Sequence, residues 1–364
     1  MEMQIRNENR VRFESIGAYV PEKIVSSEDL INRMKMKIDV DVERITGIKY
    51  RRCVSPSEKS FNLALNAAHE CLRNSRYTAV DIDVIIYTSI TRSVDDKMLQ
   101  YDPAMSQMIK KAIGADRAFE FDIVNACAGM LSGVYILESM IRSGAVKNGM
   151  VVSGEYITTI ADRAVDEISE PLDPQFASLT VGDAGAAVIL DGDGDDSACI
   201  DFIEFATAAE FSELAYGLPS EKTAGLQMVA DSKAIHMEVL GRVVPLLQAI
   251  REKYNVDGDD YDYVLPHQTA LKIMEVGRQI LAQHFRTTRV ATLTRIQDFG
   301  NTASTSHFLV LYDHLKEKNI PDGSKIIFFV FASGIQFGFL STKIGGLKIK
   351  ELENDELELT EWAS

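Results

Sequence analysis

Cys127 is the residue whose surroundings most clearly favour covalent chemistry. Within residues 119–155 the pattern predicts a strand, a turn at Cys127, a long helix and a second strand. A thiol at the N-terminus of a helix lies at the positive end of the helix dipole, which lowers its pKa and favours the nucleophilic thiolate. The small neighbours Ala126, Ala128 and Gly129 leave room for a substrate. The alternative is that this cysteine only packs in the interior, as most free cysteines do.

His267 and Asn301 are the residues that could assist such a nucleophile. His267 ends a strand predicted at 261–267, and the carboxyl ends of strands in an α/β sheet are where sites form. Asn301 lies in the turn DFGNTASTS ahead of a helix, and asparagine after glycine also favours a turn with no chemical role. The alternative for His267 is a structural role, in which its ring only forms a hydrogen bond at the junction of strand and helix. We interpret the remaining histidines as structural or solvated: His69, His236, His284, His307 and His314.

Four further residues are weaker candidates. The bend SGIQFG at 333–338 could direct backbone N–H groups, including that of Ser333, at a developing oxyanion. Glu155 follows an apolar strand and could act as a general base, although turn and cap preferences favour a residue that caps the next element. Lys272 and Arg278 follow His267 on a predicted helix and could bind an acidic partner, or form an ordinary solvated face. GDAGAAV enters a strand after a loop, which excludes a nucleotide fingerprint.

Strands and helices alternate along the chain in a pattern typical of an α/β sheet protein. The acidic stretch 191–196 predicts a boundary between two halves with a similar βα rhythm, residues 1–192 and 193–364. Outside the segments above, we expect strands at 12–20, 83–89, 325–334 and 336–344, a strand pair at 182–192, and helices at 27–36, 61–76, 103–113, 234–254, 269–285 and 304–317.

Composition narrows the classes of partner. The formal charge of −16 makes a nucleic acid or an anionic lipid surface an unfavourable partner. The four cysteines are widely spaced without a CxxC pair, so no metal or redox motif is expected. The first residues lack a signal pattern and no apolar run is long enough to span a membrane, so we expect a soluble, cytoplasmic protein.

Taken together and in order, these motifs resemble β-ketoacyl-acyl-carrier-protein synthase III and related ketosynthases of the thiolase superfamily. The similar blocks are SIGAYVPEKIVSSEDL, ERITGIKYRR, NACAGM, RSGAVKNGMVVSGE, VGDAGAAVIL, LPHQTALKI, GNTASTS and ASGIQFG. They cover residues 12 to 344, and the ordered combination is far more specific than any single motif.

The resemblance implies a thiolase-like five-layer αβαβα fold of two similar halves, working as a homodimer. Cys127 would take an acyl group from acyl-CoA or acyl carrier protein, with no permanently bound cofactor or metal. His267 and Asn301 would steady a second, malonyl- or β-ketoacyl-thioester during a Claisen condensation, usually with loss of carbon dioxide. The backbone N–H groups of Cys127 and Ser333 would form the oxyanion hole, and the acidic carrier protein could dock at Lys272 and Arg278.

Several positions depart from the family pattern. Ala270 replaces an asparagine that supports the histidine, and Asp41 replaces a tryptophan that stacks on coenzyme A; the chain's tryptophan is Trp362. The change at position 41 favours a carrier-protein-bound donor, and the change at position 270 removes a hydrogen bond that would support the His267 loop. Residues 164–178 are longer than the usual connection. The departures favour a specialised enzyme of fatty-acid or polyketide biosynthesis.

Two alternatives remain open at this point. One is an acyltransferase of the same fold that passes the acyl group to a hydroxyl or amine. The other is a silent partner subunit of a heteromeric synthase, although such a subunit need not keep the nucleophile.

Overall fold

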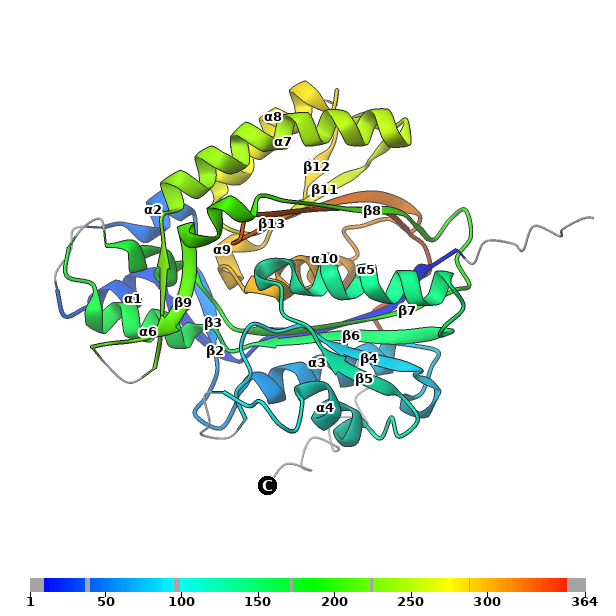
Figure 1. The fold of residues 1–364 in the computed structure, drawn as a ribbon, viewed down its shortest axis with the longest axis horizontal. Helices are drawn as coiled ribbons and strands as arrows, with labels where there is room; N and C mark the ends of the chain where they lie inside the picture. Colours follow the sequence, from blue (N-terminus) through cyan, green and yellow to red (C-terminus); the bar gives the residue numbers. More distant parts are fainter. Residues whose placement is uncertain are drawn as a thin grey trace, which may run out of the picture.

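Two five-stranded sheets enclose a pair of central helices, and further helices cover the outer face of each sheet (Figure 1). The coordinates are a computed structural model, which describes residues 10–36, 40–94, 99–170, 173–222, 225–287 and 289–351. The five layers are α3 with α4, the first sheet, α5 with α10, the second sheet, and α7 with α8. The predicted thiolase-like αβαβα layering is therefore confirmed.

The first sheet has the strand order β1-β7-β6-β4-β5. Strand β4 pairs in parallel with β5 and β6, and β7 runs antiparallel to β6 and β1. All residues of β6 and β7 are buried because helices cover both faces. The strands are β1 (Arg12–Tyr19), β4 (Val84–Tyr87), β5 (Phe119–Asp122), β6 (Asn148–Glu155) and β7 (Ala184–Asp191).

The second sheet repeats this plan in the order β12-β11-β13-β14-β8. Strand β11 is parallel to both β12 and β13, whereas β14 is antiparallel to β13 and β8. A parallel centre with an antiparallel side is thus common to both sheets. The strands are β8 (Cys199–Thr207), β11 (Tyr263–Pro266), β12 (Ala291–Thr292), β13 (Ser324–Ala332) and β14 (Gln336–Ile344).

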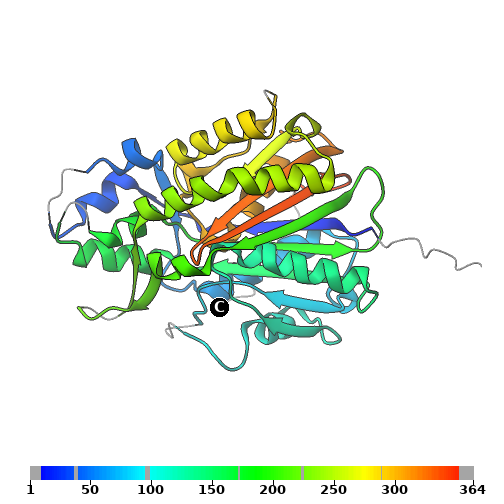
Figure 2. The ribbon, with the colours of Figure 1, turned by 45° about the horizontal axis from the view of Figure 1, so that its top comes forward.

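Most of the long helices begin and end close to where the apolar spacing predicts them. Figure 2 shows α7 lying across the strands of the second sheet. The helices of the five layers are α3 (Ser60–Asn74), α4 (Met105–Ile113), α5 (Gly129–Arg142), α7 (Ser232–Tyr254), α8 (Leu271–His284) and α10 (Ser306–Lys316). None of the described helices is both long and apolar enough to cross a membrane.

Two local predictions were wrong. Residues 182–192 form the single strand β7 rather than a strand pair, because β7 finds its partners β1 and β6 elsewhere in the chain. The helix expected at 27–36 is the shorter α1 (Ser27–Asn32), which begins with a capping box between Ser26 and Asp29.

Shorter elements surround the layered centre. They are β2 (Lys23–Ser26), β3 (Tyr50–Cys53), α2 (Val42–Thr46), α6 (Thr158–Glu167), β9 (Ala215–Pro219), β10 (Leu226–Ala230), α9 (Ile296–Phe299) and the 3₁₀ turns η1 (Ala79–Asp81), η2 (Ala126–Ala128), η3 (Pro174–Thr180), η4 (Ala209–Leu214), η5 (Gly258–Asp260) and η6 (Ala303–Thr305). Strands β9 and β10 form a hairpin that packs on η3 and α6.

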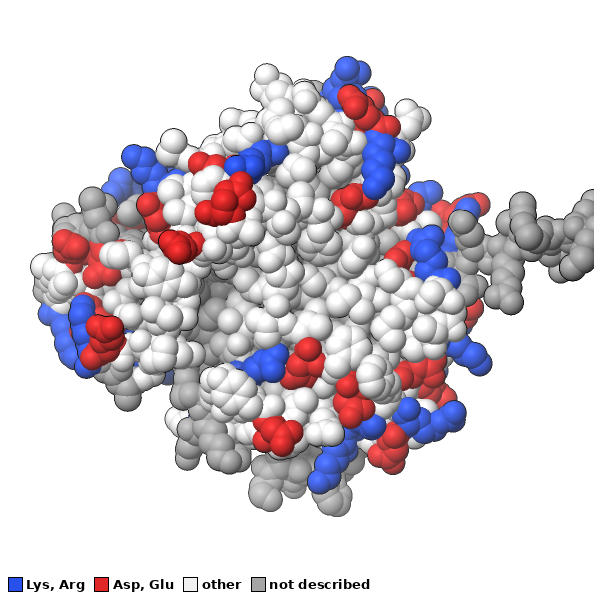
Figure 3. Space-filling model, in the orientation of Figure 1, with Lys and Arg blue, Asp and Glu red and all other residues white. Residues whose placement is uncertain are grey.

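Figure 3 shows how acidic and basic side chains are distributed on one face of the molecule. They are intermixed and lie mostly around the margin of this face, and uncharged atoms cover its middle. Many of the acidic groups are paired, for example Asp162 with Arg33 and Asp191 with Arg12. The net negative charge therefore forms no single acidic surface on this face.

Helix α3 lies unusually close to the first sheet. A Cβ atom added at Gly17, Gly154 or Gly185 would come within 2.2, 2.1 and 2.0 Å of α3 backbone atoms, respectively. The glycines on β1, β6 and β7 therefore let the helix backbone rest directly on the strands. Alanines on the facing side of α3 complete this contact: Ala64, Ala67 and Ala68.

We predict that Gly185→Ala lowers the free energy of unfolding by about 3 kcal/mol, because its methyl group would overlap the Leu63 carbonyl oxygen. Chemical denaturation measures the change. Gly241→Ala in α7, where an added Cβ meets nothing within 4 Å, is the control and should be neutral or slightly stabilising. Equal stabilities of the two variants would contradict the close approach of α3.

Candidate functional site

Cys127 lies in the middle of η2, between the end of β5 and the start of α5. The turn packs against η6, the end of β13 and the start of β14. The Gln336 side chain on β14 also donates a hydrogen bond to the side chain of Asn125, which precedes the turn. The predicted strand–cysteine–helix arrangement is present, with the thiol in a turn shared by both halves of the fold.

The pKa of Cys127 contradicts the sequence-based expectation. Burial, the larger cause, and the nearby Glu155 carboxylate together raise the pKa of the thiol to about 12. Helix α5 begins two residues after Cys127, and its positive end does not outweigh these two effects. The residue nevertheless remains half-buried rather than sealed from solvent. The resting nucleophile is therefore a protonated thiol on a half-buried residue.

Apolar side chains surround one side of Cys127. The thiol packs against a cluster that includes Ile157, Ile160 and Ala161 from the region of α6, with Val181 and Ala303. Leu226 and Met228 of the β9–β10 hairpin lie at the edge of the same cluster. A group attached to the sulfur would therefore meet an apolar wall.

His267 directly follows β11 and is almost completely buried. Its backbone N–H donates to the carbonyl of Phe329 on β13, 2.8 Å away. The Phe331 ring meets the imidazole edge-on, with 5.3 Å between ring centroids. Burial lowers the pKa of His267 well below its ordinary value, and the neighbouring His307 lowers it further. The ring is therefore neutral at physiological pH.

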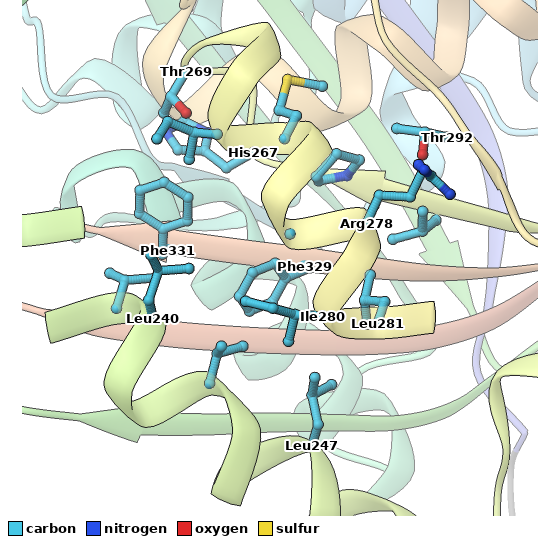
Figure 4. A pocket seen from close by; sticks show the side chains of 17 residues that line it. Leu240, Leu247, His267, Thr269, Arg278, Ile280, Leu281, Thr292, Phe329 and Phe331 are labelled. Carbon is cyan, nitrogen blue, oxygen red and sulfur yellow. The ribbon is translucent and has the colours of Figure 1, made fainter. Parts of the chain in front are cut away.

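An apolar cavity of about 40 Å³ borders His267, enclosed by α7, α8 and the second sheet (Figure 4). Leu240, Ile280, Leu281 and Phe329 are among its lining residues. Among the described residues, nothing forms a hydrogen bond with the buried Nδ1 atom of His267. These surroundings disfavour a charge on the imidazole.

Hydrogen bonds of its backbone fix the position of Asn301. Its N–H donates to Thr180 at 2.9 Å, and its carbonyl accepts from Gly182 at 3.0 Å. Its side-chain Oδ1 accepts from the backbone N–H of Ala303 at 2.9 Å, which leaves the Nδ2 hydrogens for another acceptor. Asn301 is thus oriented as a donor.

The three predicted residues come from three segments that meet at one end of the layers. Cys127 and Ala303 belong to one apolar cluster, and Ala303 is two residues after Asn301. His267 stacks on His307, which follows η6 in the same segment. The segment 301–307 therefore lies beside both Cys127 and His267.

Glu155 is completely buried at the end of β6. One carboxylate oxygen accepts from the N–H of Ile90 at 3.0 Å and from the Ser304 hydroxyl. The other accepts from the N–H and hydroxyl of Thr91 at 3.1 and 2.9 Å. Burial raises the pKa of Glu155, and these bonds oppose that rise. One oxygen therefore links β6 to Ser304 of η6 and to Ile90, and the other links it to Thr91, so Glu155 does not cap the element that follows it. Its role as a general base stays a prediction.

The remaining candidates lie around this centre. Ser333 is half-buried in the turn between β13 and β14, and the end of β13 packs on η2. On α8 Lys272 and Arg278 are exposed, but Arg278 is bound to Glu275 at 2.6 and 2.8 Å. Carrier-protein docking there stays a prediction, with Lys272 as the less neutralised cation.

The departures from the family pattern have structural consequences. Ala270 is the residue before α8 and makes no side-chain capping bond. Buried Gln268 anchors this loop instead: its amide donates to Pro266 at 2.8 Å and accepts from the Thr294 hydroxyl at 2.9 Å. Asp41 accepts from Arg44 at 2.8 Å as the N-cap of α2, and Trp362 lies outside the described residues.

Sequence reasoning missed two residues of the site. Gln268 could have been identified from the sequence, because it directly follows His267. His307, interpreted as structural, carried no local signal because its importance comes from contact with His267. The described residues contain no group of three or more His, Cys, Asp or Glu side chains that could hold a metal ion.

Comparison with known proteins agrees with this geometry. Residues 121–209 match the profile of the 3-oxoacyl-[acyl-carrier-protein] synthase III family, and residues 252–344 match the profile of its C-terminal part. Together the two matches span half of the chain. The β-ketoacyl-[acyl-carrier-protein] synthase III of Listeria monocytogenes is 28% identical over 338 residues, covering 91% of this chain and 97% of the relative.

Several solved structures have the same fold. An OleA variant from Xanthomonas campestris has a TM-score of 0.80 at 19% identity, covering 92% of this chain and 98% of its own. The priming β-ketosynthase of the R1128 polyketide pathway has a TM-score of 0.78 at 22% identity, covering 95% and 99%. The 3-oxoacyl-[acyl-carrier-protein] synthase III of Aquifex aeolicus has a TM-score of 0.75 at 22% identity, covering 92% and 99%.

We predict that Glu155→Gln lowers the pKa of Cys127, because the Glu155 charge raises it. More thiolate would then be present at pH 8 to 9, and iodoacetamide would alkylate Cys127 faster. Intact-mass measurement across pH gives the midpoint of alkylation. Glu138→Gln, which removes a buried carboxylate elsewhere on α5, should leave that midpoint unchanged. A midpoint at the wild-type pH or higher in Glu155→Gln would rule out this electrostatic influence.

Proposed function

Because the chain belongs to the 3-oxoacyl-[acyl-carrier-protein] synthase III family, we propose that it joins two thioester substrates by forming a carbon–carbon bond, with Cys127, His267 and Asn301 as its catalytic residues. The observation that carries this proposal is the segment 301–307, which lies against both the Cys127 turn and the His267 ring. One nucleophile and two neutral hydrogen-bond donors at a single site suit acyl transfer followed by enolate formation.

The first half-reaction loads Cys127. Its sulfur bonds to the acyl carbon of a thioester, the old carbon–sulfur bond breaks, and the thiol proton ends on the departing pantetheine sulfur. Since the resting thiol is protonated, its proton has to leave as the carbon–sulfur bond forms, and the departing pantetheine sulfur accepts it. The side chains of Ile157, Ile160 and Met228 favour an apolar acyl group.

The second half-reaction uses a malonyl-type thioester. Asn301 Nδ2 and the His267 imidazole donate to its thioester carbonyl. The carboxylate leaves as carbon dioxide, and its bonding electron pair passes to the α-carbon as an enolate stabilised by these donors. The α-carbon then attacks the acyl carbon on Cys127, and the sulfur leaves and regains a proton from solvent.

An oxyanion forms at the acyl carbon during both half-reactions. The backbone N–H groups of Cys127 and Ser333 are the proposed donors, because the end of β13 packs on η2 beside the sulfur. Backbone donors in a fixed turn need no reorganisation when the charge develops.

Acyl carrier protein is the proposed carrier of at least one substrate. Asp41 stands where a tryptophan would stack on coenzyme A, which favours a carrier-bound thioester. The exposed Lys272 lies on α8, five residues after His267, and offers a positive charge to an acidic carrier protein. A role in specialised fatty-acid or polyketide biosynthesis follows from the same departures.

We propose a homodimer that forms through β5. This strand is at the edge of the first sheet and would otherwise leave backbone groups unpaired. Large apolar side chains are exposed on it and nearby: Phe119 is 61%, Val124 58% and Tyr101 77% exposed. Pairing two copies along β5 would cover both the strand edge and these side chains.

We expect each half-reaction to fail in a different variant. Cys127→Ala should show no acyl adduct by intact mass with any thioester. His267→Ala and Asn301→Ala should still form the adduct but lose condensation by about 100-fold or more, because donors to the enolate are missing. Carbon dioxide release and product formation are measured with acyl and malonyl thioesters together.

The same assay tests the alternatives. Transfer of the acyl group to a hydroxyl or amine, without condensation, would favour the acyltransferase. Absence of any adduct on the wild-type protein would favour the silent partner subunit.

We predict that Phe119→Glu shifts the protein towards the monomer, because a charge would be buried in the proposed β5 interface. Light scattering after size-exclusion chromatography measures the mass. Val80→Glu, another exposed apolar position, is the control and should remain dimeric. A wild-type mass of one chain would refute the dimer.

A further inference from the structure

A second histidine lies against the proposed catalytic histidine. The imidazoles of His267 and His307 stack with 5.5 Å between ring centroids and an angle of 16° between their planes. Each residue is only 2% exposed. His307 is the second residue of α10, so it reaches His267 from the segment that also carries Asn301.

One carbonyl oxygen fixes both residues. The carbonyl of Phe329 on β13 accepts from the backbone N–H of His267 at 2.8 Å. The Nε2 atom of His307 lies 3.2 Å from the same oxygen. Since a carbonyl only accepts, Nε2 of His307 carries a hydrogen, and a neutral His307 ring then has a bare Nδ1. The orientation of His307 is thereby tied to the backbone position of His267.

Among the described residues, His307 is the titratable group whose charge acts on His267. On β11 and β13 the neighbouring side chains are Pro266, Phe329 and Phe331, and on α7 they are aliphatic. His236 of α7 contacts Phe331 rather than His267. On α8, Arg278 lines the same cavity but is bound to exposed Glu275. Two positive charges on these stacked imidazoles would repel each other.

Neutrality of His267 matters for the proposed reaction. A cationic imidazole would attract the malonyl carboxylate and stabilise the substrate before carbon dioxide leaves, which raises the barrier. A neutral imidazole held in one orientation donates a hydrogen bond to the thioester carbonyl without that penalty.

We propose that His307 is a positioning residue, which holds the His267 ring by stacking in the orientation that its hydrogen bond to the second thioester requires. This inference rests on the proposed condensation. It adds a residue that acts through His267 and does not itself touch the substrate.

His307→Phe tests the proposal, because phenylalanine keeps a stacked ring but neither bonds to Phe329 nor titrates. Condensation should fall about tenfold at pH 7 as the hold on His267 loosens. Loading of Cys127 should stay within about twofold, since it does not use the His267 donor. The acid limb of the condensation rate should move to higher pH, because His307 lowers the pKa of His267 and its removal lets His267 take a proton sooner.

Two further variants separate positioning from packing. His307→Gln keeps a side-chain N–H for the Phe329 carbonyl and should recover part of the condensation rate. His314→Phe is the matched control: it is on the same helix, its ring also lies near a backbone carbonyl, at 3.4 Å from that of Thr294, and it should leave both half-reactions unchanged.

Two results would overturn the proposal. One is a His307→Phe enzyme whose loading, condensation and acid limb all match the wild type. The other is an equal loss of loading and condensation with an unmoved acid limb, which would mean that His307 only packs. Normal condensation by His267→Ala would instead refute the proposed function itself.

Discussion

The contact between the turns η2 and η6 is the constraint on which the site depends. Ala126 in η2 has a φ of 44° and Ala303 in η6 a φ of 51°, both in the left-handed region that side-chain-bearing residues avoid. Each such conformation costs about 1–3 kcal/mol and persists only where the surrounding structure enforces it. Here that structure is the packing of η2 on η6 and on the β13–β14 hairpin. The strained turns place Cys127 and the Asn301 segment side by side.

Buried polar groups keep these turns in register with the strands. Glu155 joins β6 to residues 90–91 and to Ser304, and Gln268 joins the end of β11 to Thr294. Asp183 accepts from Val54 at 2.9 Å and from the N–H and hydroxyl of Thr158 at 2.8 and 2.7 Å. Each group is satisfied where it is buried, so removing a partner would leave an unpaired group and loosen the loop that it holds.

Burial has a chemical consequence as well as a structural one. The same low-polarity surroundings raise the pKa of the Cys127 thiol and lower those of His267 and His307, to about 4 for His307. All three groups are therefore neutral at rest. As pH falls from about 6.5 towards 4, His267 and His307 become protonated in the unfolded chain but stay neutral in the folded protein. The unfolded state then binds more protons, so the folded state loses stability.

Local patterns in the sequence determined much of this protein. Hydrophobic spacing was enough for the long helices and for strands such as β11 and β13, because their burial depends on period alone. The order of the short motifs around Cys127, His267 and Asn301 was enough to identify the family and to predict its layered fold. Those patterns extend over a few residues each, and they fail for β7, whose two partners are distant in the chain.

Only the tertiary structure decided the pKa shifts of these residues and the side chains that contact them. A helix start after Cys127 suggested a lowered pKa, but the direction depends on burial and on Glu155, 28 positions later in the sequence. His307 gained its role through the ring of His267, 40 positions away, and through a carbonyl on a third segment. Desolvation and contact between segments are properties of how the chain packs, so no local pattern contains them.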